Sequence, residues 1–225
     1  MHFTKLPFDQ FKNKVAEIFC NSLQNPVIIA STSRFGYDKA KIKGGEKLLK
    51  ELEKINDKQN IAQDKKIKLH KERADLNLSV KKKYMKILLI ARIAFDKDVI
   101  VKKALRLEGA RETALDLWIN QISVFANHLL GEADWLSILK KFGIERKELN
   151  SMLTELEKLR SATMLCEKAK TDAKKITEQK KIKTKELQQW VSDYLKIAKI
   201  ALEDNPEVYL SLRGHKNFKI KEPAD

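Results

Sequence analysis

The stretch Ala91–Phe95 (ARIAF) recurs further along the chain as Ala198–Leu202 (AKIAL), at a sequence offset of 107, and this recurrence decides the fold. The dipeptide Phe35-Gly36 returns at the same offset as Phe142-Gly143, and no gap is needed between the two landmarks. Because separate landmarks share one offset, we predict that the chain of 225 residues contains two copies of one unit.

These two copies set the predicted domain organisation. Copy one spans residues 1–107, copy two spans residues 108–214, and residues 215–225 form a polar, basic tail that we expect to be flexible. The copies are expected to intertwine into one unit, because most helical stability in proteins comes from packing of an apolar face.

The composition predicts an all-α protein. The chain is 34% charged and contains only seven Gly and four Pro, and neither residue occurs within 46–107 or within 144–205. This profile is typical of long helices, and the turn residues that separate strands are missing. No run of about 18 uncharged apolar residues occurs, so we expect no transmembrane segment and, without a signal peptide, a cytoplasmic protein.

Each copy is predicted to begin with an amphipathic helix and a short second helix, followed by the Phe-Gly turn and one very long helix. In copy one the long helix is expected from about residue 38 to 97, with a softening at Gly44-Gly45. Apolar residues recur in alternating steps of three and four along it, which is the heptad pattern of a coiled coil.

A single long helix cannot bury its own apolar stripe, so the two long helices are predicted to pair in antiparallel fashion with approximate two-fold symmetry. Apolar residues are dense at both ends of each helix and sparse in the middle. We therefore predict a dumbbell: one helical head from residues 7–55 plus 187–213, a second from 84–160, and a two-helix stalk.

The second long helix closes on Ile200–Pro206 (IALEDNP), after a Phe-Gly turn and a long helical pattern. In these features the chain resembles a group of uncharacterised bacterial all-helical proteins, over most of its length. The resemblance implies an elongated cytoplasmic helical protein. It supplies no activity, ligand or functional residue.

The residues that carry chemistry in other proteins lack a suitable arrangement here. The four histidines have no metal-ligand spacing, and no phosphate-binding loop motif occurs. Cys20 and Cys166 are predicted to be two buried thiols in a reducing compartment, with a single disulfide as the open alternative. We expect no catalytic residue, metal or cofactor, and therefore no enzyme.

The formal net charge is +15, and it concentrates in the predicted stalk. Residues 57–83 carry nine basic and four acidic residues, and residues 164–190 carry eight and four. Such a surface suits phosphate backbones or an anionic membrane, although lysines on the outer face of a coiled coil commonly serve solubility. The candidate basic surface consists of Lys65, Lys66, Lys68, Lys81, Lys82, Lys174, Lys175, Lys181 and Lys185.

Together these observations favour a non-enzymatic scaffold or protein-protein interaction module with a protein partner. The alternative is a non-specific nucleic-acid-binding protein that uses the lysine-rich stalk. A homodimer that pairs stalk to stalk is also open, whereas a membrane-active protein ranks last because the heptads are used internally.

Overall fold

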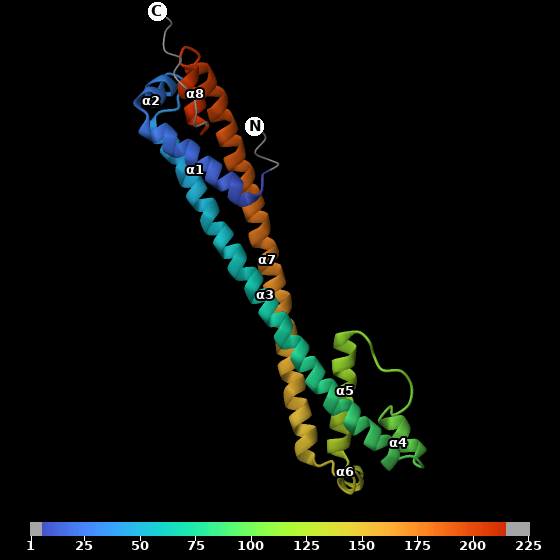
Figure 1. Ribbon diagram of the computed structural model, residues 1–225. Helices are drawn as coiled ribbons and strands as arrows, with labels where there is room; N and C mark the ends of the chain where they lie inside the picture. Colours follow the sequence, from blue (N-terminus) through green and yellow to red (C-terminus); the bar gives the residue numbers. More distant parts are fainter. Residues whose placement is uncertain (1–5, 215–225) are drawn as a thin grey trace, which may run out of the picture. The chain divides into compact units, whose positions relative to one another are not determined.

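The computed structural model describes residues 6–214, and within them it contains helices and no strand (Figure 1). The prediction of an all-α protein is confirmed for this part of the chain; the predicted tail, residues 215–225, lies outside it. The helices are α1 (Phe8–Gln24), α2 (Pro26–Ser33), α3 (Lys39–Ala94), α4 (Val99–Ala104), α5 (Leu115–Gly131), α6 (Ala133–Lys140), α7 (Arg146–Ala201) and α8 (Pro206–Leu212).

Two of these helices are very long, as the heptad pattern predicts. α3 and α7 each contain 56 residues and pack against each other. The expected softening at Gly44-Gly45 is absent, because α3 runs through both glycines without interruption. Gly45 is buried, and a Cβ there would lie 2.7 Å from the Trp190 ring and 2.8 Å from the Phe19 ring. This glycine therefore admits two large side chains against the helix.

The bounds of the helices repeat along the chain. α1 and α5, α2 and α6, α3 and α7, and α4 and α8 all begin at the same offset from each other, which is the offset of the sequence landmarks. Gly36 and Gly143 sit in the same left-handed turn conformation, both with φ 77°. Equal sequence spacing therefore goes with equal local backbone structure in the two halves. Below, two positions that this offset relates are called equivalent.

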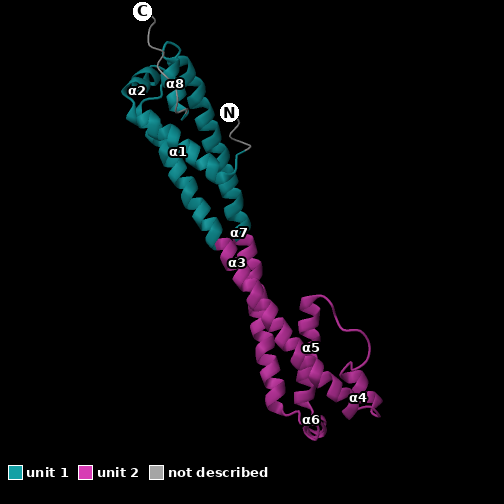
Figure 2. Ribbon diagram, in the orientation of Figure 1, with its two compact units in different colours: residues 1–61, 173–225 teal, residues 62–172 magenta. Residues whose placement is uncertain are grey.

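The first compact unit, unit 1, consists of residues 1–61 and 173–225 (Figure 2). Its described part contains α1, α2, α8, the first part of α3 and the last part of α7. The core includes Phe11, Leu52, Tyr194 and Leu212, all buried. α1 contacts α8, where the Asn21 side chain donates a hydrogen bond of 2.9 Å to the Ser211 carbonyl oxygen. A helix of copy one thus packs on a helix of copy two.

A lysine joins the two long helices at a polar position in unit 1. Lys180 of α7 donates hydrogen bonds to the side-chain oxygens of Asn56 (2.7 Å) and Gln59 (2.9 Å) on α3. Its ammonium group also lies 4.1 Å from the centre of the Phe8 ring. Burial lowers the pKa of Lys180, and the nearby Asp9 opposes this effect.

The second compact unit, unit 2, is residues 62–172, a continuous stretch that holds α4, α5, α6 and parts of α3 and α7 (Figure 2). Tyr84, Leu88, Ile122 and Leu156 are fully buried in its core. The exchange of helices recurs here, because α4 of copy one lies beside α5 of copy two. His128 Nδ1 lies 3.3 Å from the Ala104 carbonyl oxygen, at the positions equivalent to the Asn21–Ser211 pair.

One prediction about the cysteines is wrong. Both thiols are free, and Cys166 is buried, but Cys20 is exposed. Cys20 follows the buried Phe19, and one residue further along a helix turns the side chain by about 100°, away from the face that packs. An apolar run such as Ile18–Cys20 extends past the edge of the buried stripe.

Candidate interaction surface

The nine lysines of the candidate basic surface divide between the two units. Five lie on α3 in unit 2 and four lie on α7 in unit 1. All are exposed except Lys66, which is half-buried. Within the described residues, only Lys181 forms an ion pair, a marginal one of 4.0 Å with Glu178. Each unit therefore carries several of these lysines without an ion-pair partner among the described residues.

Polar side chains link α3 and α7 in unit 2. The Lys83 ammonium group donates to Glu155 Oε1 at 2.7 Å and to Ser151 Oγ at 3.0 Å, and Ser79 donates to the other carboxylate oxygen of Glu155 at 2.9 Å. The hydrogen bond from Lys83 is the largest cause that lowers the pKa of Glu155, against partial burial, which raises it. Lys83 is therefore engaged with partners on the facing helix.

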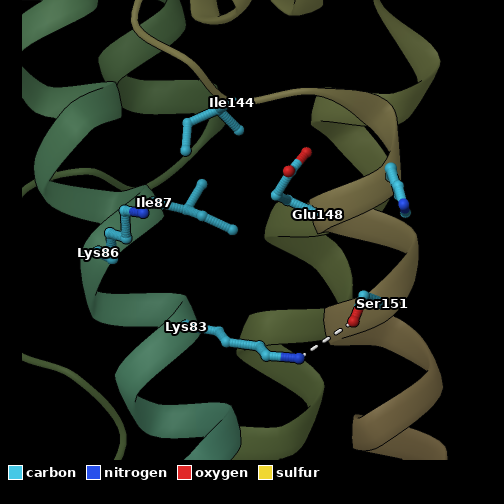
Figure 3. A pocket seen from close by; sticks show the side chains of 7 residues that line it. Lys83, Lys86, Ile87, Ile144, Glu148 and Ser151 are labelled. Carbon is cyan, nitrogen blue, oxygen red and sulfur yellow. Dashed lines mark hydrogen bonds between the residues drawn. The ribbon is translucent and has the colours of Figure 1, made fainter.

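A hollow of about 350 Å³ opens beside this link (Figure 3). Lys86 and Lys147 line it together with Ile87 and Ile144, but so does the carboxylate of Glu148. Glu148 Oε2 accepts a hydrogen bond of 3.0 Å from the Glu145 backbone N–H. The start of α7 is thus already occupied by an acidic group, which makes the hollow a poor anion site.

A strip of exposed apolar side chains follows α3 in unit 2. Ile67, Leu78 and Leu89 are 65%, 68% and 52% exposed, and they are evenly spaced along the helix. Each step between them completes three helical turns with about 20° of excess rotation, so the three side chains share one face of α3. Ile93, one turn after Leu89 and also exposed, extends this face. We call Ile67, Leu78, Leu89 and Ile93 the α3 strip.

The positions equivalent to the α3 strip are polar in copy two. The equivalents of Ile67, Leu78 and Leu89 are three exposed lysines, Lys174, Lys185 and Lys196. Among the four residues of the strip, only Ile93 has an apolar equivalent, Ile200. A helix of the same length and bounds therefore forms with lysine at these places. The packing of α3 does not require the apolar residues of the strip, which makes them candidates for a surface that another molecule covers.

The charge around the α3 strip has one sign only from Leu78 onward, because Glu72 and Asp75 lie between Ile67 and Leu78. Between positions 78 and 93 the acidic residues are absent, whereas the basic residues are Lys81, Lys82, Lys83, Lys86 and Arg92. The corresponding stretch of copy two, residues 185–200, mixes three lysines with Glu186 and Asp193. Between these two equivalent stretches, only the one on α3 lacks acidic residues.

Exposed apolar residues continue beyond the end of α3. Val99 and Ile100 at the start of α4 are both exposed, and they line a hollow with Ala94 and Ile138. Asp98 begins α4, because its carboxylate accepts a hydrogen bond of 3.0 Å from the Val101 backbone N–H. This cap holds the two apolar side chains at the first turn of α4.

The heptad analysis missed the α3 strip because it followed only the apolar residues of the seam between the long helices and left the other apolar residues unassigned. Residues 67, 78 and 89 lie outside that seam at a different spacing. The exchange of apolar residues for lysines at the equivalent positions of copy two is the signal that would have found them.

Comparison with known proteins gives no relative: no protein family, no curated protein and no solved structure matches this chain. The resemblance to bacterial all-helical proteins therefore stays a prediction. No helix within residues 6–214 is long and apolar enough to cross a bilayer. In the same residues, no group of three or more His, Cys, Asp or Glu side chains is arranged to hold a metal ion.

Proposed function

We propose that the protein is a helical protein-protein interaction module whose docking face is the α3 strip. The observation that supports this most directly is the difference between the copies: exposed Ile67, Leu78 and Leu89 stand where copy two has lysines. Apolar side chains left in water contribute little to folding, but each can contribute about 1.5–3 kcal/mol once a partner covers it fully.

The chemistry of the strip favours one kind of partner, an amphipathic helix with acidic residues beside its apolar face. Such a helix would lay its apolar side along α3 and place carboxylates against Lys81, Lys82 and Lys86, which lie among the strip residues. A second copy of this chain fits less well, because two such strips would bring rows of lysines together.

We further propose that the chain arose by internal duplication. The common offset of the helix starts supports this, and so does an exchange of volume at equivalent core positions. Gly45 faces Phe19 and Trp190 in unit 1, whereas the residues at the three equivalent positions are Met152, Ala126 and Lys83. Where the small Gly45 is replaced by the larger Met152, the two rings are replaced by the smaller Ala126 and the polar Lys83. The predicted dumbbell shape and pseudo-two-fold axis stay predictions.

A binding assay with a model peptide tests the proposed docking face. The probe is a fluorescein-labelled amphipathic helix as long as the stretch from Ile67 to Ile93, with leucines on one face and glutamates beside them. The double variant Leu78→Gln and Leu89→Gln keeps the charge and removes two apolar contacts. We expect it to weaken binding about 10–100-fold, which corresponds to half of the full burial of two leucines.

The control is the pair Met164→Gln and Leu165→Gln, which removes two exposed apolar side chains from α7 in the same unit. Binding by this control should match the wild type. Equal affinity of all three proteins for the peptide would contradict the proposal. Light scattering should show one chain per particle; a dimer that the Leu78→Gln and Leu89→Gln variant dissociates would assign the strip to a second copy instead.

A specific observation also favours the nucleic-acid alternative: Lys65, Lys68, Lys81 and Lys82 are exposed on α3 and have no ion-pair partner among the described residues. If they contact phosphates, Lys81→Gln with Lys82→Gln lowers the salt slope of duplex DNA binding by about 2. The variant Leu78→Gln and Leu89→Gln leaves DNA binding unchanged in that case. Absence of DNA binding at both low and physiological salt would rule this alternative out.

A further inference from the structure

A cleft lies in unit 2 between α4, the connecting residues 105–114 and α5. It consists of two hollows, of about 640 and 190 Å³, that share the side chains of Arg106, Glu112 and Gln121. This cleft is separate from the residues of the α3 strip, and it concerns a different class of ligand.

Positive charge exceeds negative charge in this cleft, where Lys102, Lys103, Arg106 and Arg111 line the larger hollow against Glu108 and Glu112. Lys103 and Arg106 line it, and neither makes an ion pair or a side-chain hydrogen bond within residues 6–214. Glu108 is held by Lys102 at 3.2 Å, which leaves Glu112 as the unpaired carboxylate among the lining residues.

Arg111 adds a third cation of an unusual kind. Its guanidinium donates to the Tyr84 hydroxyl (3.0 Å) and to the carbonyl oxygens of Glu108 (2.7 Å) and Gly109 (3.0 Å), all neutral acceptors. Its Nε is buried and has no acceptor among the described residues. The guanidinium is therefore fixed in place by neutral acceptors, and its positive charge adds to the charge of the cleft.

The backbone at Arg106 is held in a conformation that favours glycine. Arg106 has φ 49°, whereas its counterpart Arg213 has φ −83°. Leu107 N–H donates to the Lys102 carbonyl oxygen at 2.9 Å and Arg106 N–H to the Lys103 carbonyl oxygen at 3.2 Å, the pattern that ends a helix with a left-handed residue. Glycine is the usual choice there, so an arginine at this position suggests a function for its side chain.

The opposite wall of the cleft is apolar. Leu117 and Val124 of α5 line the smaller hollow and are exposed. The equivalent residues of copy one are Gln10 and Glu17, and Glu17 is paired with Lys14 at 2.9 Å. Polar groups therefore stand in unit 1 where unit 2 offers apolar surface.

We propose that this cleft binds a small amphiphilic anion, with a phosphate or carboxylate head at Arg106 and Lys103 and an apolar tail against Leu117 and Val124. The planar guanidinium of Arg106 suits two parallel hydrogen bonds to either head group. The Gln121 side-chain oxygen accepts from the Glu112 backbone N–H at 3.1 Å, which leaves its amide nitrogen to donate to the ligand.

Calorimetric titration of the full chain with hexyl phosphate, hexanoate, inorganic phosphate and hexanol tests this site. We expect hexyl phosphate or hexanoate to bind with a Kd below about 1 mM, and the probe with only a head or only a tail to bind at least about tenfold more weakly. The stronger of the two amphiphiles identifies the head group. Failure of both amphiphiles to bind more tightly than phosphate and hexanol would overturn the proposal.

Two variants locate the binding. Arg106→Gly should weaken the amphiphile about tenfold or more and yet raise the melting temperature by about 2–4 °C, because the glycine relieves the left-handed backbone. Leu117→Gln, which installs the residue of copy one, should weaken binding to a similar degree. The control Lys158→Gln removes an exposed lysine of α7 and should bind within about twofold of wild type. Unchanged affinity of Arg106→Gly would place the ligand elsewhere and refute the assignment.

Discussion

Replacement of each of the two adjacent glycines of α3 by alanine should change stability by different amounts. Both positions lie inside the same helix, so alanine offers the same gain in helix propensity at each, about 1 kcal/mol. A Cβ at Gly44 would meet no atom within 4 Å, whereas a Cβ at Gly45 would lie 2.7–2.8 Å from the rings of Trp190 and Phe19. The two substitutions differ in the space that they enter.

The magnitude follows from that difference. Gly44→Ala should stabilise the protein by about 1 kcal/mol. At Gly45 the new methyl group must displace two rings that pack edge to face at 5.2 Å between centroids, and overpacking of this kind costs about 1–3 kcal/mol. Because the propensity gain cancels in the comparison, the free energies of unfolding of the two variants should differ by about 1–3 kcal/mol.

Urea denaturation followed by circular dichroism measures this difference, and an unchanged slope would show that only stability has altered. A second substitution, Phe19→Leu, should remove part of the penalty of Gly45→Ala, because the two sites contact each other. Equal stability of Gly44→Ala and Gly45→Ala would refute the close approach of Phe19 and Trp190 to α3.

Three further predictions follow from the described contacts. Burial raises the pKa of Tyr194 to about 12, above the value of 10 expected when unfolded, so its contribution to stability is complete below pH 10 and is lost as the pH rises toward 12. The unfolding free energy of wild type should therefore fall more steeply over pH 10–12 than that of Tyr194→Phe; parallel curves would contradict this. Lys180→Ala should destabilise unit 1 by about 1–2 kcal/mol through loss of its hydrogen bonds, whereas Lys181→Ala should change stability by under about 0.5 kcal/mol, both measured by urea denaturation. Equal effects of the two lysine substitutions would show that the hydrogen bonds of Lys180 to α3 do not contribute to stability. A maleimide reagent should label Cys20 rapidly in the native protein and Cys166 only after denaturation, as mass spectrometry of the labelled peptides would show; rapid native labelling of Cys166 would contradict its burial.

Sequence periodicity was sufficient to predict the two long helices because local features determine them. Neither helix contains proline, and apolar residues recur at helical spacing along both. Periodicity alone could not assign Cys20, which stands at the edge of an apolar run, since the face that packs depends on the neighbouring helices.

The proposed functional surfaces were harder to predict for two different reasons. The α3 strip is visible in the sequence, but a search for one heptad stripe per helix does not separate a packed seam from a second, exposed face. The cleft beside Arg106 depends on how α4 of copy one packs on α5 of copy two and on a left-handed backbone at one residue. Such tertiary features have no periodic signature in the sequence.

The packing of helices from the two ends of the chain in unit 1 determines when each unit can complete its core during synthesis. Unit 2 is a continuous stretch of the chain, so all of its residues are synthesised before α8. Unit 1 is different, because α1 must wait for the core residues between Leu187 and Leu212. At about 5–20 residues per second, α1 is made on the order of ten seconds before the parts of α7 and α8 that complete this core. We therefore expect the apolar face of α1 to wait longer during synthesis for its complete core than any part of unit 2 does.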